Sequence, residues 1–129
     1  MGRTSGQNLS RRERQIMDAV YRLGSVTAAD VTANIPSPPT NAAVRRMLAI
    51  LEEKGHLRHV EDGPRYVYYP TIGHEKASRS ALRHLTDTFF QGSPVQTMAT
   101  LLDISGSQLT DEELEKLSRL IKQAKKEGR

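Results

Sequence analysis

The spacing of apolar residues changes abruptly at Gly55, and this change most restricts the folds open to the chain. Before it, apolar side chains recur at three- and four-residue intervals, which predicts helices. After it, residues 56–60 alternate between polar and apolar types, and residues 65–69 are rich in strand formers. The Glu-Asp-Gly-Pro segment between them is typical of a turn. Residues 9–70 therefore predict three helices followed by a β-hairpin.

Capping residues and helix breakers mark the ends of the predicted helices. Ser10 and Glu13 have the spacing of a capping box, in which each side chain accepts a hydrogen bond from the backbone N–H of the other residue. The same spacing recurs after Thr27 and after Thr110. Three prolines within residues 36–39 end the second helix, because proline lacks an N–H and clashes with the preceding turn.

The third helix, expected over about residues 40–54, has two different faces. One is an apolar stripe of Val44, Met47, Leu48 and Leu51. The opposite face is small or basic near the N-terminal end of the helix. It is acidic, at Glu52 and Glu53, near the C-terminal end, beside the predicted hairpin (the wing). A recognition helix inserts its N-terminal residues into the major groove, where alanine contacts thymine methyl groups and arginine contacts guanine edges or phosphates. The candidates for DNA contact are Ala42, Ala43, Arg45 and Arg46.

An ordinary amphipathic helix with a solvated polar face is the alternative for this segment, and the basic residues around it favour DNA. Arg65 lies at the hairpin tip, where it is a candidate for phosphate contact, and Arg11 and Arg12 begin the first helix. The formal net charge is +4, and residues 1–70 carry ten Lys and Arg against seven Asp and Glu. A purely structural hairpin, packed through its tyrosines, is the alternative for the wing.

Residues 72–129 predict further short amphipathic helices, which are too few to enclose a core by themselves. Two copies of the chain can bury each other's apolar faces, and packing against the chain's own N-terminal module is the alternative. The residues expected at a dimer interface are Leu82, Leu85, Phe89, Met98, Leu102, Leu117 and Ile121.

Several function classes are disfavoured by what the sequence lacks. There is no cysteine, which excludes disulfides and thiolate metal sites, and no glycine-rich phosphate loop or catalytic motif that would predict an enzyme. His56 and His59 are three apart on a predicted strand, so they face opposite ways and chelate a metal poorly. We expect neither cofactor nor metal; a metal-responsive regulator and a protein–protein interaction module remain as alternatives.

No apolar stretch is long enough to span a membrane, and residues 1–14 lack the apolar core of a secretory signal, so we expect a cytoplasmic protein. The polar, glycine-containing residues 1–8 predict a disordered tail. The expected organisation is this tail, a winged-helix DNA-binding domain over residues 9–71, and a helical dimerisation region over residues 72–129.

The order and spacing of these residues resemble the penicillinase repressor (BlaI/MecI) family over roughly residues 9–127. The family's N-terminal part is a winged helix and its C-terminal helices form the dimer. The resemblance is carried by Leu9-Ser10-x-x-Glu13, Ile16-Met17-x-x-Val20-Tyr21, Val26-Thr27-Ala28-x-Asp30-Val31, Thr40-x-x-x-Val44-Arg45-x-x-Leu48-x-x-Leu51-x-x-Lys54-Gly55-x-Leu57, Tyr66-x-Tyr68-x-Pro70, Phe89-Phe90-x-Gly92-Ser93 and Leu109-Thr110-x-x-Glu113-Leu114-x-x-Leu117.

The resemblance implies a repressor that binds a palindromic operator in double-stranded DNA as a homodimer, with one recognition helix in each half-site. It adds Thr40 and Asn41 to the DNA-facing residues and assigns the wing to residues 61–65. Some family members are inactivated by a protease that cuts an Asn-Phe bond, and residues 98–104 contain none. Copper-responsive relatives use a cysteine-rich tail, which this chain also lacks. The effector that relieves repression, a protease or another, is therefore left open.

Overall fold

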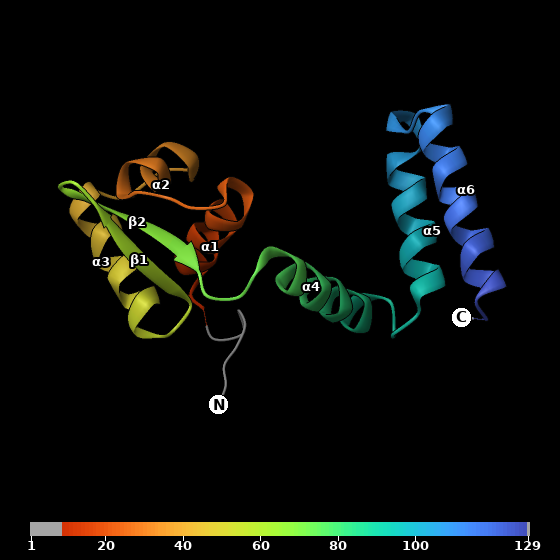
Figure 1. The fold of residues 1–129 in the computed structure, drawn as a ribbon, viewed down its shortest axis with the longest axis horizontal. Coiled ribbons are helices and arrows are strands. Elements are labelled where there is room, and N and C mark those ends of the chain that lie inside the picture. The colour runs from red at the N-terminus through yellow and green to blue at the C-terminus, as the bar shows by residue number, and fades with distance from the viewer. Residues whose placement is uncertain (1–8, 129) are drawn as a thin grey trace. The chain divides into compact units, whose positions relative to one another are not determined.

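The computed structural model describes residues 9–128, so the predicted disordered tail of residues 1–8 lies outside the described part. The chain is mainly helical with one two-stranded antiparallel sheet, which confirms the predicted fold class (Figure 1). In chain order, the elements are α1 (Arg11–Leu23), α2 (Ala28–Asn34), α3 (Asn41–Glu53), β1 (Leu57–Asp62), β2 (Arg65–Pro70), α4 (His74–Phe89), α5 (Pro94–Ser105), the 3-10 turn η1 (Gly106–Gln108) and α6 (Asp111–Lys126).

These elements form two compact units, the first ending at Ser80 and the second beginning at Ala81, inside α4. The sequence prediction of a boundary between residues 71 and 72 concerns a division of function, between DNA binding and dimerisation. That division stays a prediction.

The first unit has an aliphatic core to which every one of its helices and strands before α4 contributes. α1 packs on α2, α3 and β2, and α3 also packs on α2 and β1. The fully or almost fully buried side chains at the centre are Ile16, Val20, Val26, Val31, Val44, Leu48, Leu51 and Leu57. The predicted stripe of α3 is therefore the face that holds this helix in the unit, with Met47 half-buried at its edge.

The hairpin is joined to the helices by backbone as well as by side chains. β1 and β2 pair with Leu57 opposite Pro70 and Asp62 opposite Arg65, and Gly63 at the turn has a positive φ of 65°. Val26, before α2, exchanges two backbone hydrogen bonds with Tyr68, at N–O distances of 3.0 and 2.7 Å. The hairpin is thus joined to the helical part through β2, and the residues of its tip, 61–65, are exposed.

The predicted capping boxes are confirmed at all three positions. The Ser10, Thr27 and Thr110 side chains each accept a hydrogen bond from the backbone N–H three residues on, and the acidic side chain there accepts one in return. These contacts satisfy N–H groups that have no partner inside the helix. Helices α1, α2 and α6 therefore begin where the local sequence places them.

The second unit contains no buried residue in α5 or α6. The chain turns back at η1, so that α5 and α6 run in opposite directions (Figure 1). A hydrogen bond of 3.3 Å between the Thr97 and Thr86 hydroxyls links α5 to α4. Across residues 9–128, no helix has the length and apolar character that crossing a membrane requires.

Candidate nucleic-acid interface

The outward face of α3 is small and basic over its first half. Asn41, Ala42, Arg45 and Arg46 are all exposed, and Ala43 is half-buried. Thr40 caps the helix, with its hydroxyl accepting a hydrogen bond of 3.1 Å from the Ala43 N–H. Because Val44, Leu48 and Leu51 on the opposite face are fully buried, the exposed surface of the helix lies on this outward side. The structure therefore presents the predicted DNA-facing residues of this helix together at its N-terminal end.

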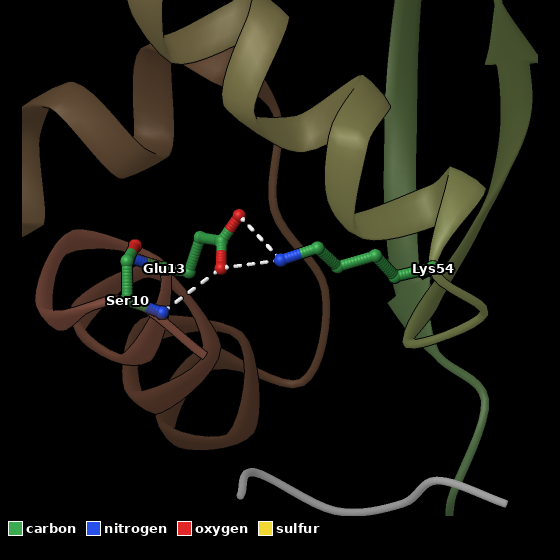
Figure 2. Close-up of polar contacts among 3 residues, drawn as sticks. All are labelled: Ser10, Glu13 and Lys54. Carbon is green, nitrogen blue, oxygen red and sulfur yellow. Dashed lines mark hydrogen bonds and ion pairs between the residues drawn. The ribbon is translucent and has the colours of Figure 1, made fainter. Parts of the chain in front are cut away.

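An ion pair with a buried carboxylate fixes the other end of α3 to the start of α1 (Figure 2). The Lys54 Nζ lies 2.9 and 3.1 Å from the two carboxylate oxygens of Glu13, and the Ser10 N–H donates to the same carboxylate at 3.0 Å. Glu13 is only 7% exposed. Lys54 caps the C-terminus of α3, so the pair holds α3 against α1 across 41 residues of sequence.

The electrostatics of this pair favour the ionised carboxylate. Burial raises the pKa of Glu13, but the hydrogen bond from Ser10 and the charge and hydrogen bonds of Lys54 outweigh it, and the net result is a pKa below the ordinary value. Glu13 is therefore charged at neutral pH in the folded chain. The capping carboxylate predicted from the sequence has a second role, as the partner of Lys54.

A second contact joins the acidic end of α3 to the wing. The Glu52 carboxylate lies 2.8 Å from the His59 Nδ1 and also accepts the His59 backbone N–H at 3.2 Å. The His59 ring stacks on Tyr66, with ring centroids 4.1 Å apart and planes inclined by 10°. Glu52 thus lies near the wing as expected, and its contact with His59 joins β1 to α3.

The tyrosines of the hairpin differ in their surroundings. Tyr68 is buried in the core, and its pKa is raised by that burial, with smaller contributions from the charges of Glu52 and Tyr66. Tyr66 remains 45% exposed and packs on His59. Tyr69 lies beneath the Arg58 guanidinium, which is 4.8 Å from the ring centroid. Packing therefore accounts for these aromatic side chains.

Arg65 is exposed at the wing tip, as the sequence analysis expects. Its Nη2 lies 2.9 Å from an oxygen of Asp62 in the facing strand position. Both side chains are more than 60% exposed, so the pair is weak and a phosphate can compete for the guanidinium. Arg65 therefore remains a candidate for contact with the phosphate backbone of DNA.

The adjacent Arg11 and Arg12, predicted together as DNA contacts, have different environments. Arg11 is exposed, and no hydrogen bond or ion pair of its side chain is found among residues 9–128. Arg12 is half-buried and donates to the Pro36 and Ser37 carbonyl oxygens at 2.8 and 2.9 Å. The sequence analysis missed this contact because no local pattern relates Arg12 to a loop more than twenty residues away.

The predicted dimer-interface residues are all exposed in the single chain. Their exposed fractions run from 38% at Leu117 to 73% at Phe89. Other large apolar side chains of α5 and α6, including Val95, Leu101 and Leu120, are exposed as well. These two helices therefore carry a large apolar surface that the second unit itself does not bury.

No group of three His, Cys, Asp or Glu side chains among residues 9–128 lies close enough to hold a metal ion. The His59 ring, one member of the predicted weak histidine pair, faces Glu52 and Tyr66.

Comparison with known proteins gives a family match over most of the chain. A family model described as the penicillinase repressor matches residues 9–123. No curated protein matches. The solved structure of MepR, a transcription regulator of the Staphylococcus aureus multidrug efflux pump MepA, is 18% identical, with a TM-score of 0.50, over 95% of this chain and 82% of that one.

Two other solved structures are similar at lower structural scores. BpsR of Bordetella bronchiseptica, whose DNA binding is regulated by 6-hydroxynicotinic acid, is 13% identical, with a TM-score of 0.48, over 93% of this chain and 77% of that one. A point mutant of Lactococcus lactis ZitR in complex with DNA is 23% identical, with a TM-score of 0.44, over all of this chain and 82% of that one. At such identities, the likeness to MepR concerns the fold alone.

Proposed function

Because this chain belongs to the penicillinase repressor family of DNA-binding transcription regulators, we propose that it represses genes by binding a two-fold symmetric operator as a homodimer. The observation that carries the proposal is the exposed, small and basic leading half of α3, on a helix whose opposite face is held in the core by Val44, Leu48 and Leu51. Such a surface suits insertion into the major groove, because alanines allow close approach and arginines supply donors and charge.

Each candidate residue has a role in this proposal. Arg45 and Arg46 reach base edges or flanking phosphates, while Ala42 and Ala43 allow the helix to approach the groove. The N–H groups at the start of α3 and its dipole favour a phosphate near Thr40 and Asn41. Arg65 at the wing tip and Arg11 on α1 are assigned to the DNA backbone.

The homodimer is supported by the apolar surface of the second unit. Helices α5 and α6 contain no buried residue, yet their apolar side chains lie at helical spacing on common faces. Leaving that surface in water is unfavourable by about 25 cal/mol per Å² of apolar area. A second copy of the chain supplies a matching apolar surface and, through two-fold symmetry, a second recognition helix for the other half-site.

The proposal is tested by selecting duplexes from a random-sequence pool with the full chain, then measuring affinity for a selected and a scrambled duplex by fluorescence anisotropy. We expect Arg46→Ala to weaken binding to the selected duplex by about 1–3 kcal/mol if Arg46 reads a base. Arg79→Ala is the matched control, since Arg79 is an exposed arginine of α4 whose Nη2 lies 3.3 Å from the Glu75 carboxylate. Equal losses of Arg46→Ala on both duplexes would assign Arg46 to the phosphates, and failure to bind any duplex at low salt would refute the function.

A further inference from the structure

Within the described residues, no backbone hydrogen bond joins two residues of the turn between α2 and α3. Residues 35–40 read Ile-Pro-Ser-Pro-Pro-Thr, and its three prolines have no N–H to donate. Ser37 has a φ of 45°, in the left-handed region that a residue with a Cβ rarely adopts. The conformation of this turn therefore depends on contacts from outside it.

Arg12 supplies those contacts. Its Nη1 donates to the Pro36 carbonyl oxygen at 2.8 Å, and its Nη2 donates to the Ser37 carbonyl oxygen at 2.9 Å. The Gln15 side chain, one helical turn on, accepts a further bond from Nη1 at 3.0 Å and so orients the group. The rigid planar fork of a guanidinium suits two neighbouring acceptors in a way that a lysine ammonium does not.

The clamped turn leads directly into the recognition helix. Thr40, the N-cap of α3, comes three residues after Ser37, and the exposed leading face follows at once. We propose that Arg12 is a positioning residue: its guanidinium holds the α2–α3 turn and so sets where the leading end of α3 meets DNA, while Arg11 beside it is free to contact phosphate. The proposal rests on the function proposed above and replaces the sequence-based assignment of Arg12 to the DNA backbone.

The first arm of the test needs no DNA. Amide hydrogen exchange is measured on the full chain for the Ala43 and Val44 N–H groups, which donate to the Thr40 hydroxyl and carbonyl oxygens. The proteins compared are the wild type, Arg12→Gln, Arg12→Lys and the matched control Arg11→Gln. We expect exchange in this segment to be on the order of tenfold faster in Arg12→Gln, because the turn loses two charge-assisted hydrogen bonds. Arg12→Lys should restore little of the protection. Unchanged exchange in Arg12→Gln would overturn the clamp.

The second arm separates positioning from phosphate contact. Affinity for the selected and the scrambled duplex is measured against salt concentration. The logarithm of the affinity falls with the logarithm of the salt concentration, and each lost phosphate contact makes this fall less steep by about 0.9. We expect Arg12→Gln to keep the wild-type slope and to lose about tenfold in preference for the selected duplex. A slope reduced by about 0.9, with the preference unchanged, would make Arg12 a phosphate ligand and overturn the proposal.

The two arms also keep this inference distinct from the proposed function. If the wild-type chain bound no duplex, the proposed function would fail, and the exchange rates would still decide whether Arg12 holds the turn. If the wild type binds and Arg12→Gln matches it in preference and exchange alike, the function stands and the positioning role is wrong.

Discussion

Replacing Lys54 by methionine tests whether the Glu13–Lys54 pair fixes α3 against α1. In the wild type, Glu13 is only 7% exposed. Once Lys54 is replaced, the Ser10 N–H is the remaining donor to this carboxylate among the contacts described above. Breaking a fully buried pair in this way costs about 3–5 kcal/mol. The Lys54 side chain is 41% exposed, so we expect a smaller loss of about 2–3 kcal/mol in the free energy of unfolding.

Glu13→Gln is the matched variant, because it removes the negative charge of the carboxylate and so leaves no buried charge without a partner. The amide oxygen can still accept the Ser10 N–H, and the Lys54 ammonium returns to water, so we expect a loss of about 1 kcal/mol. Urea denaturation followed by circular dichroism, at one fixed protein concentration, measures both variants. In the Glu13→Gln background, Lys54→Met should lower the free energy of unfolding only slightly, because no buried carboxylate then loses its partner.

The pH dependence of these variants follows from the direction of the pKa shift. In the wild type, the pKa of Glu13 is lowered on folding, so its ionisation stabilises the fold above its unfolded pKa. That stabilisation is lost as the pH falls through the lowered folded pKa. Lys54→Met removes the charge and the hydrogen bonds by which Lys54 lowers the pKa of Glu13. The pKa of Glu13 should therefore lie higher than in the wild type, and the difference in unfolding free energy between variant and wild type should narrow on acidification. The reasoning would be refuted if the difference in unfolding free energy between Lys54→Met and the wild type did not depend on pH. It would also be refuted if Lys54→Met lost no more unfolding free energy than Glu13→Gln.

Two further perturbations probe the dimer and the wing. Leu117→Asp should produce single subunits in analytical ultracentrifugation and abolish tight duplex binding, because both half-sites must be engaged together, whereas Ser118→Asp on the polar face of the same exposed helix should do neither. Glu52→Gln should weaken binding to the selected duplex a few-fold by loosening the contact with His59 while leaving the salt slope unchanged, as fluorescence anisotropy can measure; a reduced slope would instead indicate an altered phosphate contact.

Local patterns were sufficient to predict most of the fold. The capping boxes begin α1, α2 and α6 as expected, and the change in apolar spacing at Gly55 correctly separates α3 from the hairpin. The exposed face of α3 also follows from its sequence, because the position of its buried stripe determines which residues are left outside. These predictions use interactions between residues a few positions apart, which a single sequence displays directly.

The contacts that hold α3 in place could not be predicted in this way. Glu13 and Lys54 are 41 residues apart, and Arg12 and Pro36 are 24 apart, so neither pair has a spacing that marks it. The residues of each pair come together only through the tertiary packing of the helices. Similarly, the apolar stripes of α5 and α6 predict a covered surface, and the identity of the covering partner comes from the family resemblance and the proposal built on it.

Sedimentation of the wild-type chain with a duplex selected from the random pool tests the central claim most directly. We expect two chains on each duplex carrying two related half-sites, with their centres about one helical turn or a multiple of it apart. One chain per duplex, or equal binding to selected and scrambled sequences, would contradict the account of a paired repressor that reads its operator with α3.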